Sequence, residues 1–117
     1  MRVVSARRLE LSHEWGSFAL REVDTGDRLD PADLPMPESL ATRLTSWSAR
    51  WDTTFDLDRP DRPKVDRWVL DELARDGARL WRAVLTVLPA QSYEVVYRHD
   101  DTLYRRVEEL PDHWRLA

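Results

Sequence analysis

The sequence predicts an α+β fold with the element order β-β-α-α-β-β. Two long segments in the middle of the chain repeat apolar residues every three to four positions, which puts these residues on one face of a helix. The segments before and after them alternate apolar and polar residues, as half-buried strands do. Strands on both sides of a run of helices favour two long helices packed on one face of a mostly antiparallel sheet. We expect residues 1–117 to form one such domain.

The N-terminal part predicts an antiparallel hairpin. Residues 2–12 are the first strand, because apolar and charged side chains alternate toward their end. Residues 17–23 show the same period and are the second strand. The turns fall at 12–16 and 24–27, and Gly26 suits the second because glycine accepts a positive φ.

The first long helix is expected at 37–52, after a single helical turn at 30–34. Asp30 caps that turn and Pro31 takes its first position. The long helix opens with a proline followed by an acid, and both suit a helix N-terminus. Its apolar face consists of Leu40, Leu44, Trp47 and Trp51.

A connector rich in aspartate and proline leads to the second long helix. Residues 52–58 are poor helix formers and are expected to be extended or irregular, and 59–63 are expected to be a loop. The helix is predicted at 64–88 and ends before Pro89. Gly77 interrupts it at a cost of about 1 kcal/mol relative to alanine, so we expect the other helix or the sheet to approach closely there. The apolar face consists of Val69, Leu73, Leu80, Trp81, Val84 and Leu88.

The C-terminal part predicts a second hairpin. Residues 92–98 alternate aromatic and β-branched side chains with polar ones, a strong strand pattern. A turn at 99–102 leads to a short strand at 103–107. The remaining tail, 112–117, carries Trp114 as an anchor.

Composition narrows the class of protein. There is no cysteine, which excludes disulfides, thiolate metal sites and cysteine nucleophiles and fits a reducing compartment. No apolar stretch has the length of a signal peptide or a membrane span, so we expect a cytoplasmic protein without a membrane partner. The net charge of −4 disfavours nucleic acid as a partner. Only Lys64 among the 18 basic residues is a lysine, a bias typical of a GC-rich genome.

The polar residues give no pattern of catalytic, cofactor-binding or metal-binding residues. The sequence has neither a glycine-rich phosphate loop nor a nucleophile elbow. The histidines lack metal-ligand spacing, although His13 and His99 lie in predicted turns that could meet at one end of the sheet. The densest acidic group lacks the glycine and terminal glutamate of an EF-hand, so we expect a solvated connector balanced by arginines. That group consists of Asp52, Asp56, Asp58 and Asp61.

Arginine pairs near both ends of the chain allow two interpretations. Arg7-Arg8 and Arg105-Arg106 would form a basic stripe if their strands were neighbours, and tyrosines beside it would stack single-stranded nucleic acid. The favoured interpretation is a solvent-facing sheet surface with cross-strand arginine–glutamate pairs. The glutamates available for such pairs are Glu10, Glu22, Glu94 and Glu108.

Two tryptophans lie outside the predicted apolar faces. Trp15 is in the first loop, next to Glu14, and Trp68 is near the start of the second long helix. Exposed tryptophans often anchor protein interfaces, so Trp15, Trp68 and Glu14 are our candidates for partner binding. For the two tryptophans, partial burial at the edge of the core is the favoured alternative.

The middle of the chain resembles a group of small uncharacterised α+β proteins from high-GC bacteria. The resembling motifs are LDPADLP at 29–35, LATRL at 40–44, WDTTFD at 51–56, DGARL at 76–80 and YEVVY at 93–97. The resemblance implies an α+β domain. Members of this kind look similar to immunity proteins that neutralise secreted toxins, and they supply no catalytic residues.

The leading hypothesis is therefore a non-enzymatic domain that binds another protein, with an immunity or antitoxin role as its most concrete version. An acidic protein with surplus aromatic residues suits a basic protein partner. A second hypothesis is a small metal-dependent or acid/base enzyme that uses the segment Asp52–Asp61, with His13 or Glu14 as further candidates. A third is a homodimeric scaffold that pairs through an exposed strand edge.

Overall fold

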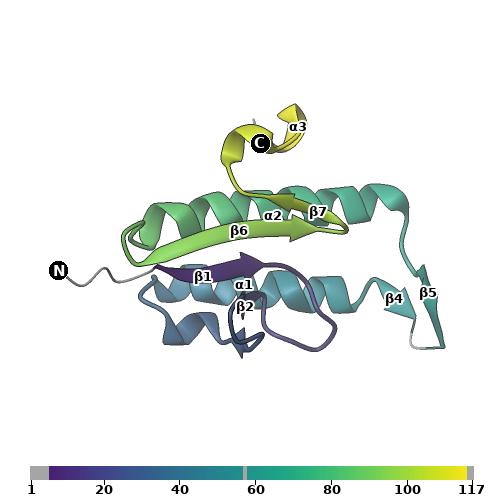
Figure 1. The fold of residues 1–117 in the computed structure, drawn as a ribbon. Helices are drawn as coiled ribbons and strands as arrows, with labels where there is room; N and C mark the ends of the chain where they lie inside the picture. Colours follow the sequence, from purple (N-terminus) through teal and green to yellow (C-terminus); the bar gives the residue numbers. More distant parts are fainter. Residues whose placement is uncertain (1–5, 57, 116–117) are drawn as a thin grey trace.

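The computed structural model describes residues 6–56 and 58–115, and within them one mixed sheet carries the fold (Figure 1). Its strands run in the order β3-β2-β1-β6-β7. Their bounds are β1 (Arg7–Leu11), β2 (Leu20–Glu22), β3 (Arg28–Leu29), β6 (Tyr93–His99) and β7 (Thr102–Tyr104). A separate two-stranded ribbon consists of β4 (Phe55–Asp56) and β5 (Arg59–Pro63).

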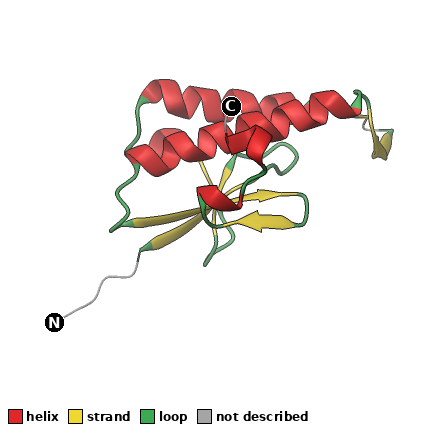
Figure 2. Ribbon diagram, turned by 90° about the horizontal axis from the view of Figure 1, so that it is seen from above, coloured by secondary structure: helices red, strands yellow, loops and turns green. Residues whose placement is uncertain are grey.

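Two long antiparallel helices cover one face of this sheet and leave the other open (Figure 2). They are α1 (Glu38–Asp52) and α2 (Arg67–Val87). Short helices precede and follow them: η1 (Pro31–Asp33), η2 (Val107–Glu109) and α3 (Asp112–Arg115). The predicted α+β class, with two long helices on one face, is thus confirmed. No described helix combines the length and the apolarity that crossing a bilayer requires.

The strand pairing is less antiparallel than the sequence predicted. Both hairpins form, since β1 pairs antiparallel with β2 and β6 with β7. The central pair, β1 with β6, is parallel, with Leu9 opposite Val95. The chain between these strands makes a crossover through both long helices, which is the kind of connection that parallel neighbours need. The sheet is therefore mixed.

The predicted element list was incomplete and some bounds were wrong. β3 was not predicted, and residues 59–63 form β5 and not a loop. The two prolines of β5 favoured a loop, but a two-stranded ribbon has free edges that tolerate residues without an N–H group. The strand expected at 103–107 ends at Tyr104, and the expected tail forms α3. The predicted strand 2–12 is described from residue 6 onward, and residues 1–5 and 116–117 lie outside the described part.

The core lies between the sheet and the two long helices. Both predicted apolar faces are buried over most of their length, and Trp47, Trp81 and Leu44 are almost completely inaccessible. The indole N–H of Trp47 donates to the carbonyl of Leu73 at 2.8 Å, and that of Trp81 donates to the carbonyl of Val95 at 3.0 Å. These bonds fix α1 to α2 and α2 to the sheet, because each satisfies a buried donor across two elements.

Gly77 lies where both the other helix and the sheet approach α2. A Cβ atom there would lie 2.5 Å from Tyr97 Oη and 2.7 Å from Trp47 Cζ2. The close approach expected from the sequence is therefore confirmed for both neighbours.

We expect Gly77→Ala to lower the free energy of unfolding by about 1–3 kcal/mol, because overpacking outweighs the gain in helix propensity. Urea denaturation of the variant measures this change. Arg79→Ala, on the exposed side of the same helix, should change stability by less than about 0.5 kcal/mol. A Gly77→Ala variant more stable than wild type would contradict this prediction, because it would show that the side chains of Tyr97 and Trp47 move aside at little cost.

Candidate functional site

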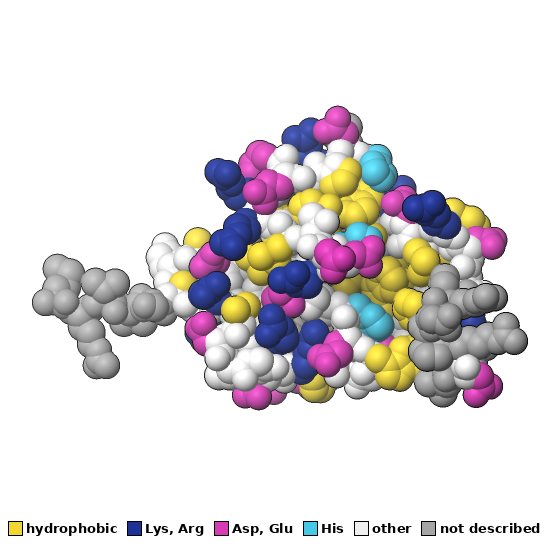
Figure 3. All heavy atoms as spheres, turned by 45° about the vertical axis from the view of Figure 1, so that its right-hand side comes forward, with side chains coloured by type: hydrophobic (Ala, Val, Ile, Leu, Met, Phe, Trp, Pro, Cys, Tyr) yellow, Lys and Arg dark blue, Asp and Glu magenta, His cyan; other side chains and the backbone are white. Residues whose placement is uncertain are grey.

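Polar and aromatic residues that lie outside the core cluster at one end of the molecule. We call it the loop end: the β1–β2 loop (residues 12–19), the last turn of α1, the β6–β7 turn and the start of α2. These segments meet because α1 and α2 are antiparallel and both strand connections fall at this side of the sheet (Figure 1). Figure 3 brings this end forward and shows apolar and histidine side chains interspersed with acidic ones.

Histidines and tryptophans form a continuous cluster at the loop end. The ring of His13 stacks on Trp51 with centroids 5.6 Å apart, and His99 lies 6.1 Å from the same indole. His99 also meets Trp114 of α3 edge-on at 5.4 Å, and Tyr104 packs on Trp114. The two turn histidines thus come to one end of the sheet, as the sequence suggested, and both contact Trp51. Trp114 is a buried anchor.

Each histidine pairs with an aspartate, but no metal-binding group results. His13 Nε2 lies 2.8 Å from Asp52 Oδ1. The other two pairs, His99 with Asp100 and His113 with Asp71, are looser, at 3.5 Å and 3.6 Å. In the part of the chain that the structure describes, no three side chains of the metal-ligating types come together. The side chains of Asp56 and Asp61, which belong to the acidic group, lie outside the described part.

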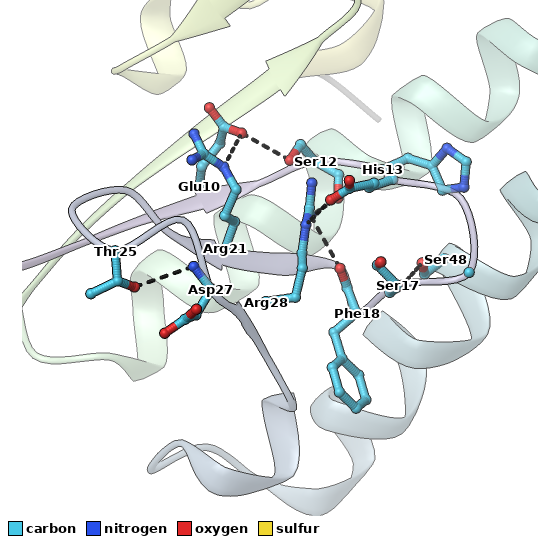
Figure 4. Close-up of polar contacts among 12 residues, drawn as sticks. Glu10, Ser12, His13, Ser17, Phe18, Arg21, Thr25, Asp27, Arg28 and Ser48 are labelled. Carbon is cyan, nitrogen blue, oxygen red and sulfur yellow. Dashed lines mark hydrogen bonds and ion pairs between the residues drawn. The ribbon is translucent and has the colours of Figure 1, made fainter.

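Two residues of α1 fasten the β1–β2 loop. Asp52 Oδ1 accepts the backbone N–H of Gly16 at 3.1 Å as well as its bond with His13. One turn earlier, Ser48 Oγ donates to the carbonyl of Ser17 at 2.8 Å (Figure 4). Gly16 has a φ of +68°, a conformation that other residues seldom adopt. The loop therefore has a defined shape against the helix.

Arg28 of β3 fastens the same loop from the other side. Its Nη1 donates to the carbonyls of Ser12 and Phe18 at 3.0 Å and 3.1 Å, and its Nε pairs with Glu14 at 2.8 Å. Figure 4 shows the guanidinium between the two loop ends and the ring of Phe18 turned away from it. This arginine's role could not be predicted from the sequence, because its loop partners lie up to 16 positions away.

The predicted partner-binding residues are exposed. Trp15 and Trp68 are 46% and 66% accessible, and Phe18, which was not predicted, is 41% accessible. The Glu14 side chain is also largely exposed, although it pairs with Arg28. Trp15 and Glu14 belong to the β1–β2 loop and Trp68 to the first turn of α2, so two of the segments at the loop end carry an exposed indole.

A groove runs between the β1–β2 loop and α1. Its volume is about 460 Å³, within the range of ligand and side-chain binding pockets. The lining residues are Gly16, Ser17, Phe18, Arg28, Thr45, Ser48, Ala49 and Asp52. A smaller cavity of about 190 Å³ lies beside the aromatic cluster and is lined by His13, Trp51 and His99, among others.

The open face of the sheet carries a buried carboxylate. Glu10 of β1 is only 4% accessible, although it points away from the helices. It accepts from Arg98 Nε at 2.9 Å, from Arg21 Nε at 3.3 Å and from Ser12 Oγ at 2.9 Å. Burial raises the pKa of Glu10, but hydrogen bonds from Arg98, Arg21 and Ser12 outweigh it and leave the pKa lowered.

These contacts confirm the cross-strand arginine–glutamate pairs. A further pair joins Arg7 and Glu22 at 2.8 Å. The condition for the basic stripe is not met, because β6 lies between β1 and β7, the strand that precedes Arg105. Tyr97 faces the helices and donates to the carbonyl of Ala74. Tyr104 lies opposite Tyr97 in the β6–β7 register and therefore shares its face.

The chain matches a known protein family. The model of a family described as "Serratia CdiI immunity protein-like" matches residues 7–100, from the first residue of β1 to the β6–β7 turn. This stretch contains the whole β1–β2 loop, both long helices and the groove. No curated protein matches the chain.

Proposed function

We propose that this chain, which belongs to the Serratia CdiI immunity protein-like family, binds a protein toxin and neutralises it by occupying the toxin's surface. The family match over residues 7–100 carries this proposal. Neutralisation by binding requires a specific interface and no chemistry of the protein's own. A bacterial cytoplasmic location follows from the proposal if the toxin acts inside the cell.

The loop end supports the proposal as the partner-binding surface. Trp15 and Trp68 are exposed indoles, and such residues dominate the binding energy of many interfaces. The β1–β2 loop is fastened by Asp52, Ser48 and Arg28, so little ordering remains to be done when a partner binds. Glu14 adds an exposed acid beside Trp15.

The charge of the protein favours a basic partner. The net charge is −4, and exposed acids at the loop end include Glu14 and the turn residues Asp100 and Asp101. A positive charge on the partner would accelerate its association with this acidic protein, and added salt would screen this attraction. We therefore expect added salt to weaken binding mainly through a slower association rate.

One observation favours an acid/base enzyme as the second candidate. The His13–Asp52 pair, 2.8 Å apart and beside the 190 Å³ cavity, resembles a base held by an orienting carboxylate. The same Asp52 oxygen, however, also fastens Gly16, which gives the pair a structural use. The homodimeric scaffold finds little support in the described sheet edges, since β3 and β7 are two and three residues long.

The test uses the product of the gene directly upstream as the probe, because the proposal expects that gene to encode the toxin domain. Wild-type protein should protect cells that express this domain. It should also bind the purified domain in surface plasmon resonance measurements. Trp15→Ala and Trp68→Ala should each weaken binding by about tenfold or more through faster dissociation. Leu85→Ala is the matched control, because Leu85 is exposed on the far half of α2 and should have no effect.

Two outcomes would contradict the proposal. One is a purified protein that neither binds this toxin domain nor protects against it. The other is turnover in a hydrolase activity screen that disappears in His13→Ala, which would favour the enzyme hypothesis.

A further inference from the structure

We infer that the groove between the β1–β2 loop and α1 receives a lysine or arginine side chain of the partner protein, with Asp52 as its counter-ion. The inference rests on the proposed function and adds the place and the chemistry of the central contact. It involves three groove residues that the sequence did not mark for partner binding: Phe18, Asp52 and Ala49.

The walls of the groove suit a long side chain with a cationic head. Phe18 is 41% accessible and offers a ring face, and Ala49 adds an apolar surface on α1. Thr45 and Ser48 contribute hydroxyl groups along the same helix. Lysine and arginine bury their methylene stems along apolar surfaces, and their charged heads interact favourably with aromatic rings. A partner side chain without a cationic head would leave the Asp52 carboxylate of this lining without a counter-ion.

Asp52 has an oxygen available for such a head. Its Oδ1 bonds with both His13 and Gly16, whereas its Oδ2 has no hydrogen-bond partner among the described residues. The carboxylate lines the groove and its side chain is 29% accessible. A charge-assisted bond to the second oxygen would be stronger than one between neutral groups. The bonds to Oδ1 hold the carboxylate in place before the partner arrives.

The charges around the groove leave a place for one cation. Arg28 is the guanidinium that lines it, but its side chain is only 15% accessible and pairs with Glu14. Its Nη1 is already used by two loop carbonyls. With Glu14 matched by Arg28, the carboxylate of Asp52 is the acid of the groove lining that a partner's cation would complete.

The experiment is a double-mutant cycle between this protein and the upstream toxin domain. Asp52→Asn keeps the shape of the side chain and an acceptor for Gly16, and removes the charge. We expect it to weaken binding by about ten- to hundredfold, and one lysine or arginine of the toxin domain, replaced by alanine, should lose most of its effect in the Asp52→Asn background. Asp33→Asn, an exposed acid near the other end of α1, makes the same change of net charge and is the control.

Phe18→Ala supplies a second variant that leaves the carboxylate intact. It should weaken binding to the same toxin domain without lowering the melting temperature, because the ring is exposed. Equal effects of Asp52→Asn and Asp33→Asn, or no toxin cation that couples to Asp52, would overturn the groove assignment while the proposed function stands. Wild-type protein that fails to bind the toxin domain would overturn both.

Discussion

Replacing Trp47 with alanine should lower the free energy of unfolding by about 3–5 kcal/mol. Its side chain is 2% accessible and lies edge-on to Trp51, with ring centroids 6.2 Å apart. The Trp47 ring also fills the space next to Gly77 of α2. An alanine at position 47 is too short to reach α2, so it would leave this space empty. The variant loses the bond from the indole N–H to the Leu73 carbonyl as well. A cavity and a lost buried hydrogen bond therefore act together.

Urea denaturation of Trp47→Ala measures this loss, and Trp68→Ala is the matched control. Trp68 is 66% accessible, so its replacement should change stability by less than about 0.5 kcal/mol. Trp51→Ala should fall in the same range as Trp47→Ala, because Trp51 is also buried and supports His13 and His99. A loss below about 1 kcal/mol at both buried positions would mean that the apolar face of α1 contributes little to the core.

The long helices could be predicted because their signal is local. The apolar residues of α1 and α2 recur within each segment, and prolines mark the start of α1 and the end of α2. Even the close contact at Gly77 followed from the cost of a glycine within a helix. The parallel pairing of β1 with β6 could not be predicted, because nothing in either strand encodes the direction of a neighbour so far along the chain.

In the candidate site, too, some features could be predicted from the sequence and others could not. The position of Trp15 and Trp68 outside the apolar faces could be anticipated, because neither residue fits an apolar period. The favoured expectation of partial burial at the edge of the core was wrong, since both side chains are exposed. The role of Asp52 could not, since its partner His13 lies 39 positions away. Phe18 falls within the strand predicted at 17–23, but β2 begins only at Leu20 and the Phe18 side chain is left partly exposed.

The buried carboxylate on the open sheet face should make stability depend on pH. Glu10→Gln should lower the free energy of unfolding at pH 7 by about 2–3 kcal/mol, because hydrogen bonds to an ionised acceptor are stronger than those to an amide. Arg21 and Arg98, from the strands on either side of β1, would then face each other without the charge between them. The two guanidinium groups are partly accessible, so water compensates part of this effect.

The sign of the pH dependence follows from the direction of the pKa shift. The pKa of Glu10 is lowered in the folded state by its hydrogen bonds to Arg98, Arg21 and Ser12, which outweigh burial. The stabilisation is therefore complete above the ordinary pKa of a glutamate and is lost as the pH falls through the lowered value. The difference between wild type and Glu10→Gln, measured by urea denaturation from neutral to acidic pH, should shrink on acidification.

Glu94→Gln is the control for this measurement, because Glu94 lies on the same sheet face but is exposed. Its replacement should change stability by less than about 0.5 kcal/mol at every pH. A loss in Glu10→Gln that stays constant from neutral to acidic pH would contradict the prediction. Such a result would mean that the packing of the Glu10 side chain between β2 and β6, and not its negative charge, stabilises the three central strands.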